Sequence, residues 1–214
     1  MAPSGCGRAM LSSFMPARIP PPPTILAHIR RADWRTMPWK NGGGITHELW
    51  REGEGREGWA LRLSMAEVSL PGPFSRFPGI NRVILLLSGA GFVLRRSDGV
   101  LHSVTQVAHP FPFLGEDDWQ VELPAGPVLD FNLMFDREQG HAALWTQQPG
   151  VCSADFFLCL EAGELAGVAV GELDLLRLEG VFWTDLVGVG IRWVRSEPDG
   201  PALPAPRRSA ALSG

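Results

Sequence analysis

The chain has 214 residues, of which 45% are hydrophobic and 20% are charged, and its formal net charge is −4 at pH 7. This composition supports a packed core and argues against wholesale disorder. A nucleic-acid-binding protein should carry a concentrated basic stripe, which this acidic chain lacks, so we expect no direct contact with nucleic acid. Three cysteines without C-x-x-C spacing indicate a reducing, cytoplasmic setting, and no apolar stretch is long enough to span a bilayer.

Both ends of the chain differ in composition from the middle. Residues 1–23 include a run of four prolines and lack the apolar region of a signal peptide, so we predict a flexible leader. Translation starting at Met1, Met10 or Met15 would each be compatible with this leader. Residues 197–214 are rich in proline, alanine and serine and are predicted to be a disordered tail.

Between the two ends, short apolar runs alternate with glycine and proline turns, which favours strands over helices. In chain order, strands are predicted at 24–29, 45–50, 59–66, 83–87, 92–94, 100–104, 119–123, 128–135, 156–160, 173–178 and 187–194. Many short strands without intervening helices indicate an all-β barrel or sandwich. The run at 156–160 echoes the run at 83–87, so we predict a first lobe over 24–146 and a second, smaller lobe over 147–196.

Two of these strands have contrasting faces. In 128–135 the odd-numbered side chains are all apolar, whereas Asp130 and Asn132 share the even-numbered face. In 59–66 the side chains of Leu61, Leu63 and Met65 share one face, while Arg62 shares the other with small residues. Small neighbours leave room for an anion beside a guanidinium, which can grip a carboxylate with two parallel hydrogen bonds. The alternative is an exposed arginine or a structural ion pair, for instance with Asp130.

Two glycine-rich segments are open to a functional interpretation. Asn41-Gly42-Gly43-Gly44 is either a loop that directs backbone N–H groups at a carboxylate or a tight turn at the rim of a barrel. Gly53-x-Gly55-x-x-Gly58 matches a dinucleotide-binding pattern but precedes a strand instead of a helix. Without a helix N-terminus it offers no pyrophosphate site, so we interpret it as a hairpin turn.

Histidine spacing argues against a metal centre. A metal-binding cupin usually supplies an H-x-H pair together with further ligands that converge on one point. No two of the five histidines lie within four positions of each other, so we expect neither a metal nor another cofactor. These histidines are His28, His47, His102, His109 and His141.

Four stretches in the middle of the chain resemble the HutD/Ves family. They are residues 39–46 (WKNGGGIT), 59–66 (WALRLSMA), 72–82 (GPFSRFPGINR) and 130–134 (DFNLM). The resemblance implies a double cupin, an RmlC-like jelly roll with two β-barrel lobes in one chain, often paired as a homodimer. HutD members are associated with histidine-utilisation genes and are thought to bind an acidic intermediate such as formylglutamate or urocanate, whereas Ves members are associated with stress responses.

Carried onto this chain, the resemblance implies a ligand site without an assigned catalytic residue. The implied contacts are Trp39, Asn41, Gly43, Gly44, Thr46, Arg62, Ser64 and Arg82, supported by Asp130 and Asn132. We therefore expect metal-independent binding of a small carboxylate in a regulatory or sensing role. One alternative is a cupin isomerase or hydrolase that uses His47 or Asp130 as a general base. The other is an inert barrel that serves as a structural or interaction module.

Overall fold

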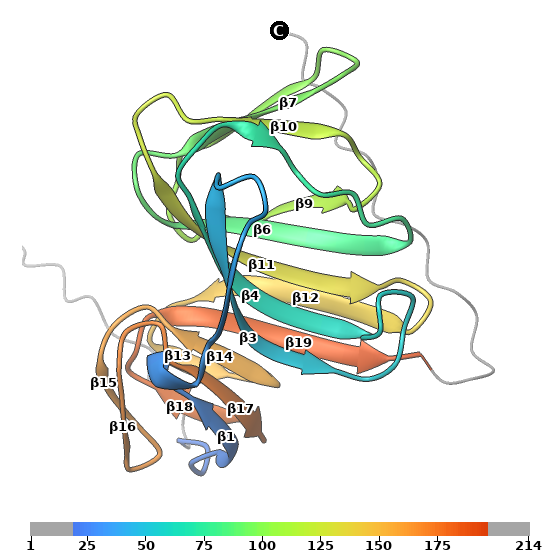
Figure 1. Cartoon of the computed structure of the whole chain (residues 1–214). Helices are drawn as coiled ribbons and strands as arrows, with labels where there is room; N and C mark the ends of the chain where they lie inside the picture. Colours follow the sequence, from blue (N-terminus) through green and yellow to red (C-terminus); the bar gives the residue numbers. More distant parts are fainter. Residues whose placement is uncertain (1–18, 197–214) are drawn as a thin grey trace, which may run out of the picture.

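The computed structural model describes residues 19–196 and shows an all-β protein with two lobes (Figure 1). Among these residues the one helical element is the short 3-10 turn η1 (Arg31–Asp33). The expectations for residues 1–18 and 197–214 lie outside the described range. Within that range, no helix has both the length and the apolar character needed to cross a membrane.

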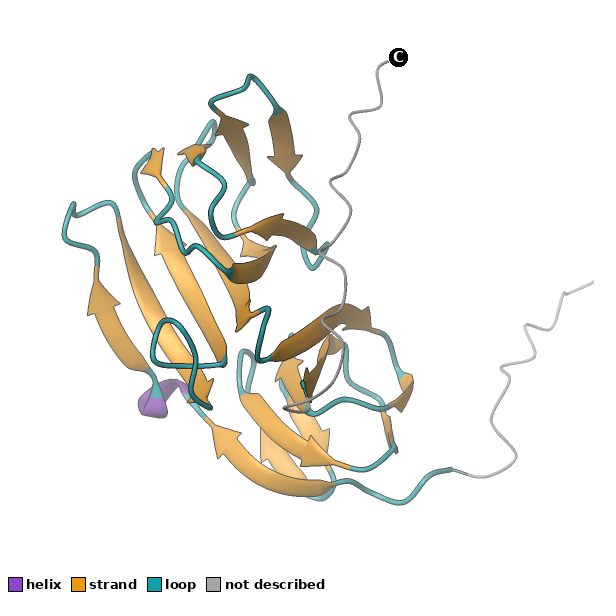
Figure 2. Ribbon diagram, turned by 90° about the vertical axis from the view of Figure 1, so that its right-hand side faces the viewer, coloured by secondary structure: helices purple, strands orange, loops and turns teal. Residues whose placement is uncertain are grey.

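The first lobe consists of a six-stranded and a four-stranded sheet whose apolar side chains pack against each other, and the sheets are seen from two sides in Figure 1 and Figure 2. The larger sheet has the order β2 (Arg35–Pro38), β3 (Gly44–Glu52), β4 (Leu61–Val68), β11 (Val128–Asp136), β6 (Ile80–Ser88) and β9 (Phe111–Leu114). The smaller sheet has the order β5 (Gly72–Pro73), β10 (Trp119–Glu122), β7 (Phe92–Arg96) and β8 (Leu101–Val104). Apolar side chains from both sheets, among them Ile84, Phe92 and Val121, fill the space away from the site described below.

The second lobe is built on a five-stranded sheet. Its order is β1 (Thr24–Ile29), β17 (Leu175–Glu179), β14 (Phe156–Cys159), β19 (Gly188–Arg195) and β12 (Gly140–Gln147). Two small sheets cover it, β13 (Gly150–Cys152) with β18 (Phe182–Thr184), and β15 (Gly163–Leu165) with β16 (Val168–Val170). Cys152 and Cys159 are free thiols buried in the apolar interior of this lobe.

The two lobes are joined through a third apolar layer between the six-stranded and the five-stranded sheet. Leu61, Leu63 and Met65 of β4 point into this layer and meet residues such as Phe156 and Ile191 of the second lobe. At its edge, Oε2 of Glu52 on β3 accepts a hydrogen bond of 2.5 Å from Nη1 of Arg177 on β17. The strands that form the main wall of the first lobe therefore have their outer faces covered by the second lobe.

Every strand predicted from the sequence is present, with ends shifted by a few residues. The segment 53–58 is a turn between β3 and β4, with Gly53 and Gly58 at positive φ, as the hairpin interpretation required. The sequence missed eight of the strands that the structure describes. Of these, β9 is an edge strand interrupted by Pro112, and β12 has side chains that are mostly small or polar. The other six have two to four residues each: β2, β5, β13, β15, β16 and β18. Both β1 and β12 fall in the range predicted for the first lobe, yet they hydrogen-bond into the sheet of the second.

Candidate functional site

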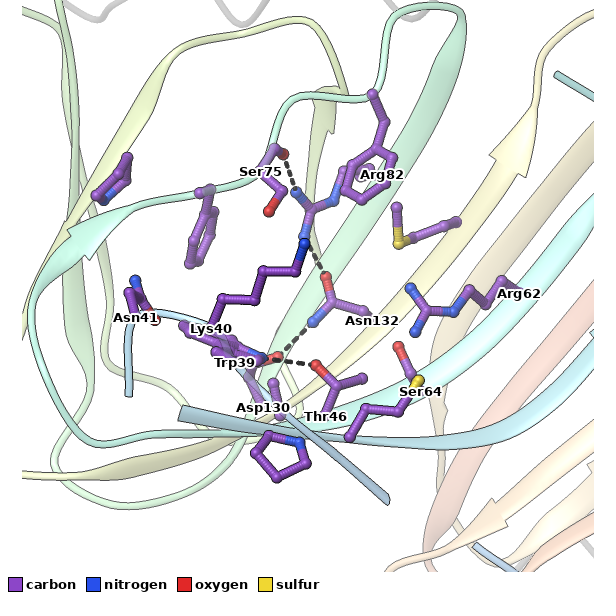
Figure 3. Close-up of a pocket in the computed structure, with 17 residues that line it drawn as sticks. Trp39, Lys40, Asn41, Thr46, Arg62, Ser64, Ser75, Arg82, Asp130 and Asn132 are labelled. Carbon is purple, nitrogen blue, oxygen red and sulfur yellow. Dashed lines mark hydrogen bonds between the residues drawn. The ribbon is translucent and has the colours of Figure 1, made fainter. Parts of the chain in front are cut away.

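A cavity of about 570 Å³ lies inside the first lobe (Figure 3). The inner faces of β3, β4, β6 and β11 form its main wall, and residues 37–41 and 73–77 complete it. It is lined by Met37, Pro38, Trp39, Lys40, Asn41, Thr46, Arg62, Ser64, Ala66, Pro73, Phe74, Ser75, Phe77, Arg82, Asp130, Asn132 and Met134. All the side chains expected at the site are in this set, and Gly43 and Gly44 are not.

Strand register explains why residues far apart in the chain meet here. Side chains alternate between the two faces of a strand, so the even-numbered residues of β4 and β11 turn into the barrel while the odd-numbered ones enter the layer between the lobes. Antiparallel pairing then places them in rows across the sheet. The rows across β4, β11 and β6 are Arg62–Met134–Arg82, Ser64–Asn132–Ile84 and Ala66–Asp130–Leu86.

Arg82 is a buried cation whose guanidinium group is surrounded by three phenylalanine rings. Its side chain lies over the rings of Phe74, Phe77 and Phe113, with Cζ 5.3, 5.7 and 4.7 Å from their centroids. Arg82 is only 7% exposed, and burial lowers its pKa to about 10, which leaves it charged near neutral pH. Nη2 donates to Oδ1 of Asn132 at 2.7 Å, whereas Nε has no hydrogen-bond partner among the described residues.

Arg62 sits at the other end of the same row, and its charge is already partnered. Its Nε donates to Oε2 of Glu48 at 2.8 Å, and Glu48 also lies 3.8 Å from both Arg35 and Arg51. Of the alternatives considered from the sequence, an ion pair is correct, but the partner is Glu48 and not Asp130. Figure 3 shows the guanidinium of Arg62 directed towards Ser64 and Asn132, so it still faces the cavity.

Asp130 is a nearly inaccessible carboxyl group at the wall of the cavity. It is 1% exposed, and its Oδ1 accepts a hydrogen bond of 2.5 Å from Nδ2 of Asn132. Burial raises the pKa of Asp130 from 3.8 to about 7, an effect that the positive charge of Arg82 partly opposes. Asp130, Asn132 and Arg82 thus form one hydrogen-bonded chain across neighbouring strands.

The loop between β2 and β3 is a tight turn that brings aromatic and polar side chains to the cavity. Nε1 of Trp39 donates to Oγ1 of Thr46 at 2.8 Å, and Oδ1 of Asn41 accepts a bond of 3.0 Å from the backbone N–H of Gly43. A Cβ added at Gly44 would lie 2.5 Å from the carbonyl oxygen of Glu67, so this position admits only glycine. The N–H of Gly43 is therefore used within the turn and is not directed at a ligand.

Several residues at the site were missed by sequence reasoning. Lys40 lies between Trp39 and Asn41, which were both expected at the site, and its positive charge could have indicated that it belongs there too. Ser75 and Phe74 belong to a segment that contains no regular strand beyond Gly72–Pro73, so alternation gave no indication that it faces the cavity. Glu48 lies two residues after Thr46 in a regularly paired part of β3, so alternation was the signal that could have placed both on one face.

His47, one of the two general-base candidates, does not line the cavity. It lies on the opposite face of β3, where Nε2 is 3.0 Å from Oε1 of Glu67 and Nδ1 is 3.0 Å from Oγ1 of Thr36. Asp130 is the candidate base that does reach the cavity wall. In residues 19–196, no three His, Cys, Asp or Glu side chains are grouped in a way that would hold a metal ion.

Comparison with known proteins identifies the same family that the sequence motifs resemble. The model of the HutD family matches residues 31–178. An uncharacterised 21.2 kDa protein in the hutC 3′ region of Pseudomonas putida is 37% identical over 164 residues, which cover 71% of this chain and 86% of that protein. Protein Ves of Escherichia fergusonii is 37% identical over 106 residues, covering 48% of this chain and 55% of the relative.

Solved structures show the same relationship in three dimensions. HutD from Pseudomonas fluorescens SBW25, described as the formate condition, superposes with a TM-score of 0.71 at 31% identity, covering 80% of this chain and 99% of that one. A conserved protein of unknown function from Pseudomonas aeruginosa PAO1 gives a TM-score of 0.64 at 28% identity, covering 78% and 98%. The predicted all-β fold is thereby confirmed, and it is the fold of a solved HutD structure.

Proposed function

Because the chain belongs to the HutD family, we propose that the cavity of its first lobe binds a small carboxylate in a regulatory or sensing role. The observation that carries this proposal is the setting of Arg82. A guanidinium that is 7% exposed has lost most of its hydration, and a bound anion would compensate its charge. Arg62 lies in the same row across the sheet and faces the same space.

The size and chemistry of the cavity favour a small acid. A volume of about 570 Å³ falls in the range of ordinary small-molecule sites. Arginine suits a carboxylate because its planar fork can donate two parallel hydrogen bonds. The structure of the P. fluorescens relative is described as a formate condition, and formate is the smallest carboxylate.

Two observations support a link to histidine utilisation. The P. putida relative is described by its place in the hutC 3′ region, and the P. fluorescens relative is described as HutD. Formylglutamate and urocanate, the acids that the resemblance implies, both carry a carboxylate that Arg82 would recognise. We therefore place them beside formate as the first ligands to test.

The test is a titration of the purified chain with formate, formylglutamate and urocanate, followed by calorimetry and by thermal melting. A ligand that binds the native state should raise the melting temperature in proportion to its occupancy. Arg82→Met should weaken binding about 100-fold, because two charge-assisted hydrogen bonds are lost. Arg95→Met is the matched control, since Arg95 is an exposed arginine of β7 paired with Glu122 outside the cavity.

The outcomes separate the alternatives. Binding by wild type and by Arg95→Met, together with loss in Arg82→Met, supports the proposal. Equal affinity in a well-folded Arg82→Met protein would remove Arg82 from the site. No binding of any of the three acids by the wild type would contradict carboxylate recognition and leave the inert barrel as the better interpretation.

A further inference from the structure

The ionisable groups around the cavity are unequally balanced. Its lining contains the cations Lys40, Arg62 and Arg82, whereas Asp130 is its one acid among the described residues. Arg62 has a separate counter-ion in Glu48, at 2.8 Å. Arg82 is connected to a carboxylate only through Asn132, which accepts from Arg82 and donates to Asp130. The charge of the buried Arg82 is therefore compensated chiefly by Asp130.

The other strands around Asp130 bring no further charge to it. Its partners across the sheet are Ala66 on β4 and Leu86 on β6, and Thr46 pairs with Ala66 from β3. His47 and Glu67, the nearest titratable neighbours along β3 and β4, are bonded to each other at 3.0 Å and do not line the cavity. Arg82, Arg62 and Lys40 are thus the charged groups that share the cavity with Asp130.

We propose that the cavity takes up its anionic ligand together with a proton, which Asp130 binds as the ligand replaces it as the counter-ion of Arg82. This inference rests on the proposed function, because it concerns the same carboxylate site. Two buried anions cannot share one buried cation without a large electrostatic cost, and the inaccessible carboxylate is the one that can be neutralised in place. Asp130 acts here as a positioning residue, through Asn132, and does not need to touch the ligand.

The direction of the effect follows from charge. Burial already holds the pKa of Asp130 near 7, and the attraction of Arg82 is what keeps it from rising further. A ligand carboxylate at Arg82 offsets that attraction, so the pKa of Asp130 rises on binding and a proton is taken up from solvent. Affinity should fall about tenfold between pH 6 and pH 8, because the protonated fraction of a carboxyl group with a pKa near 7 falls from about nine-tenths to about one-tenth over this range.

The experiment is calorimetry of the full chain with sodium formate at pH 7.5 in triethanolamine and in Tris, two cationic buffers that differ in ionisation enthalpy and do not compete with formate for Arg82. A difference in apparent binding enthalpy reports the protons taken up, and we expect between about one half and one proton per formate. The dissociation constants for formate at pH 6 and pH 8 give an independent measure of proton uptake on binding. Formate remains an anion over this range, so its own titration does not contribute.

Asp130→Asn should abolish both the proton uptake and the pH dependence. At pH 8 this variant should bind formate about tenfold more tightly than the wild type, because a neutral amide does not compete for Arg82. Asp185→Asn removes an exposed acid of the second lobe and should titrate like the wild type.

Formate binding with equal enthalpy in both buffers and equal affinity at pH 6 and pH 8 would overturn the inference and leave carboxylate binding intact. Proton uptake that persists in Asp130→Asn would overturn the role of Asp130. If that variant does not fold, the two wild-type measurements still decide whether binding takes up a proton. Absence of formate binding at every pH would overturn both this inference and the proposed function.

Discussion

The interiors of the two lobes differ although both are small β-barrels. The second lobe is filled by apolar side chains such as Phe157, Phe182 and Leu176, each fully buried. The first lobe has an apolar portion too, but Arg82, Asp130 and Asn132 occupy inward positions beside it and surround a cavity. The barrel architecture alone therefore does not produce the cavity, and the identity of a few inward residues does.

The same difference is seen in how each interior satisfies its polar groups. Burying a charged group is unfavourable unless it is paired and hydrogen-bonded. The first lobe meets this condition with the chain from Asp130 through Asn132 to Arg82, and with the pair Arg62–Glu48. The apolar cluster of the second lobe contains no charged residue, and the buried Asp174 of this lobe lies 2.6 Å from Nε2 of His28. Arg62, Arg82 and Asp130 line the cavity of the first lobe, and the second lobe packs against the outer face of its larger sheet.

The largest effect should come from emptying part of the second lobe. Phe157→Ala removes a side chain that is 0% exposed and should lower the free energy of unfolding by about 3–5 kcal/mol. Formate affinity should stay within twofold of the wild type where the variant is folded, because the new space is apolar. Chemical denaturation and calorimetry measure the two quantities, and Val181→Ala, at an exposed position of the same lobe, is the control. A parallel loss of affinity would show that the lobes are not functionally separate.

A somewhat smaller and pH-dependent effect is expected from Asp130→Asn in the first lobe. The pKa of Asp130 is about 7 in the folded chain against an ordinary 3.8, so unfolding releases a proton between these values. The unfolded chain loses this proton at lower pH than the folded chain does, so the free energy of unfolding falls as pH rises from about 4 to 7. Above pH 7 the whole of this destabilisation is present. The free energy of unfolding of the variant should be higher than that of the wild type by about 2–4 kcal/mol at pH 8, and the two should be almost equal at pH 4. Urea unfolding at both pH values tests this, and a gain that is independent of pH would contradict it.

The smallest effects should come from substitutions at Arg62 and at Glu48, with which Arg62 is paired. Arg62→Ala should weaken formate binding about tenfold, less than the change at Arg82, because Glu48 already offsets the charge of Arg62. Glu48→Gln should act in the opposite direction and tighten binding a few-fold, since it releases Arg62 towards the cavity. Calorimetric titration of both variants with formate compares them. Equal losses in Arg62→Ala and Arg82→Met would mean that the two cations hold the ligand jointly.

The sequence predicted the local part of this arrangement and missed the part that depends on partners. Alternation in 59–66 and 128–135 correctly assigned which side chains share a face, because that depends only on the period of a strand. It did not show that the apolar face of these strands meets a second lobe, nor that Glu48 pairs with Arg62. Both depend on which strands and sheets become neighbours, and this is not encoded within a single strand.

The position of β1 has a consequence for folding kinetics. This strand is the first to be synthesised among the described elements, and its partner β17 is among the last. His28 on β1 and Asp174 beside β17 meet at 2.6 Å across a separation of 146 residues. Contacts between distant segments slow folding because a long loop must close before they form. The edge of the second sheet should therefore be completed late, with β1 waiting unpaired while the first lobe assembles.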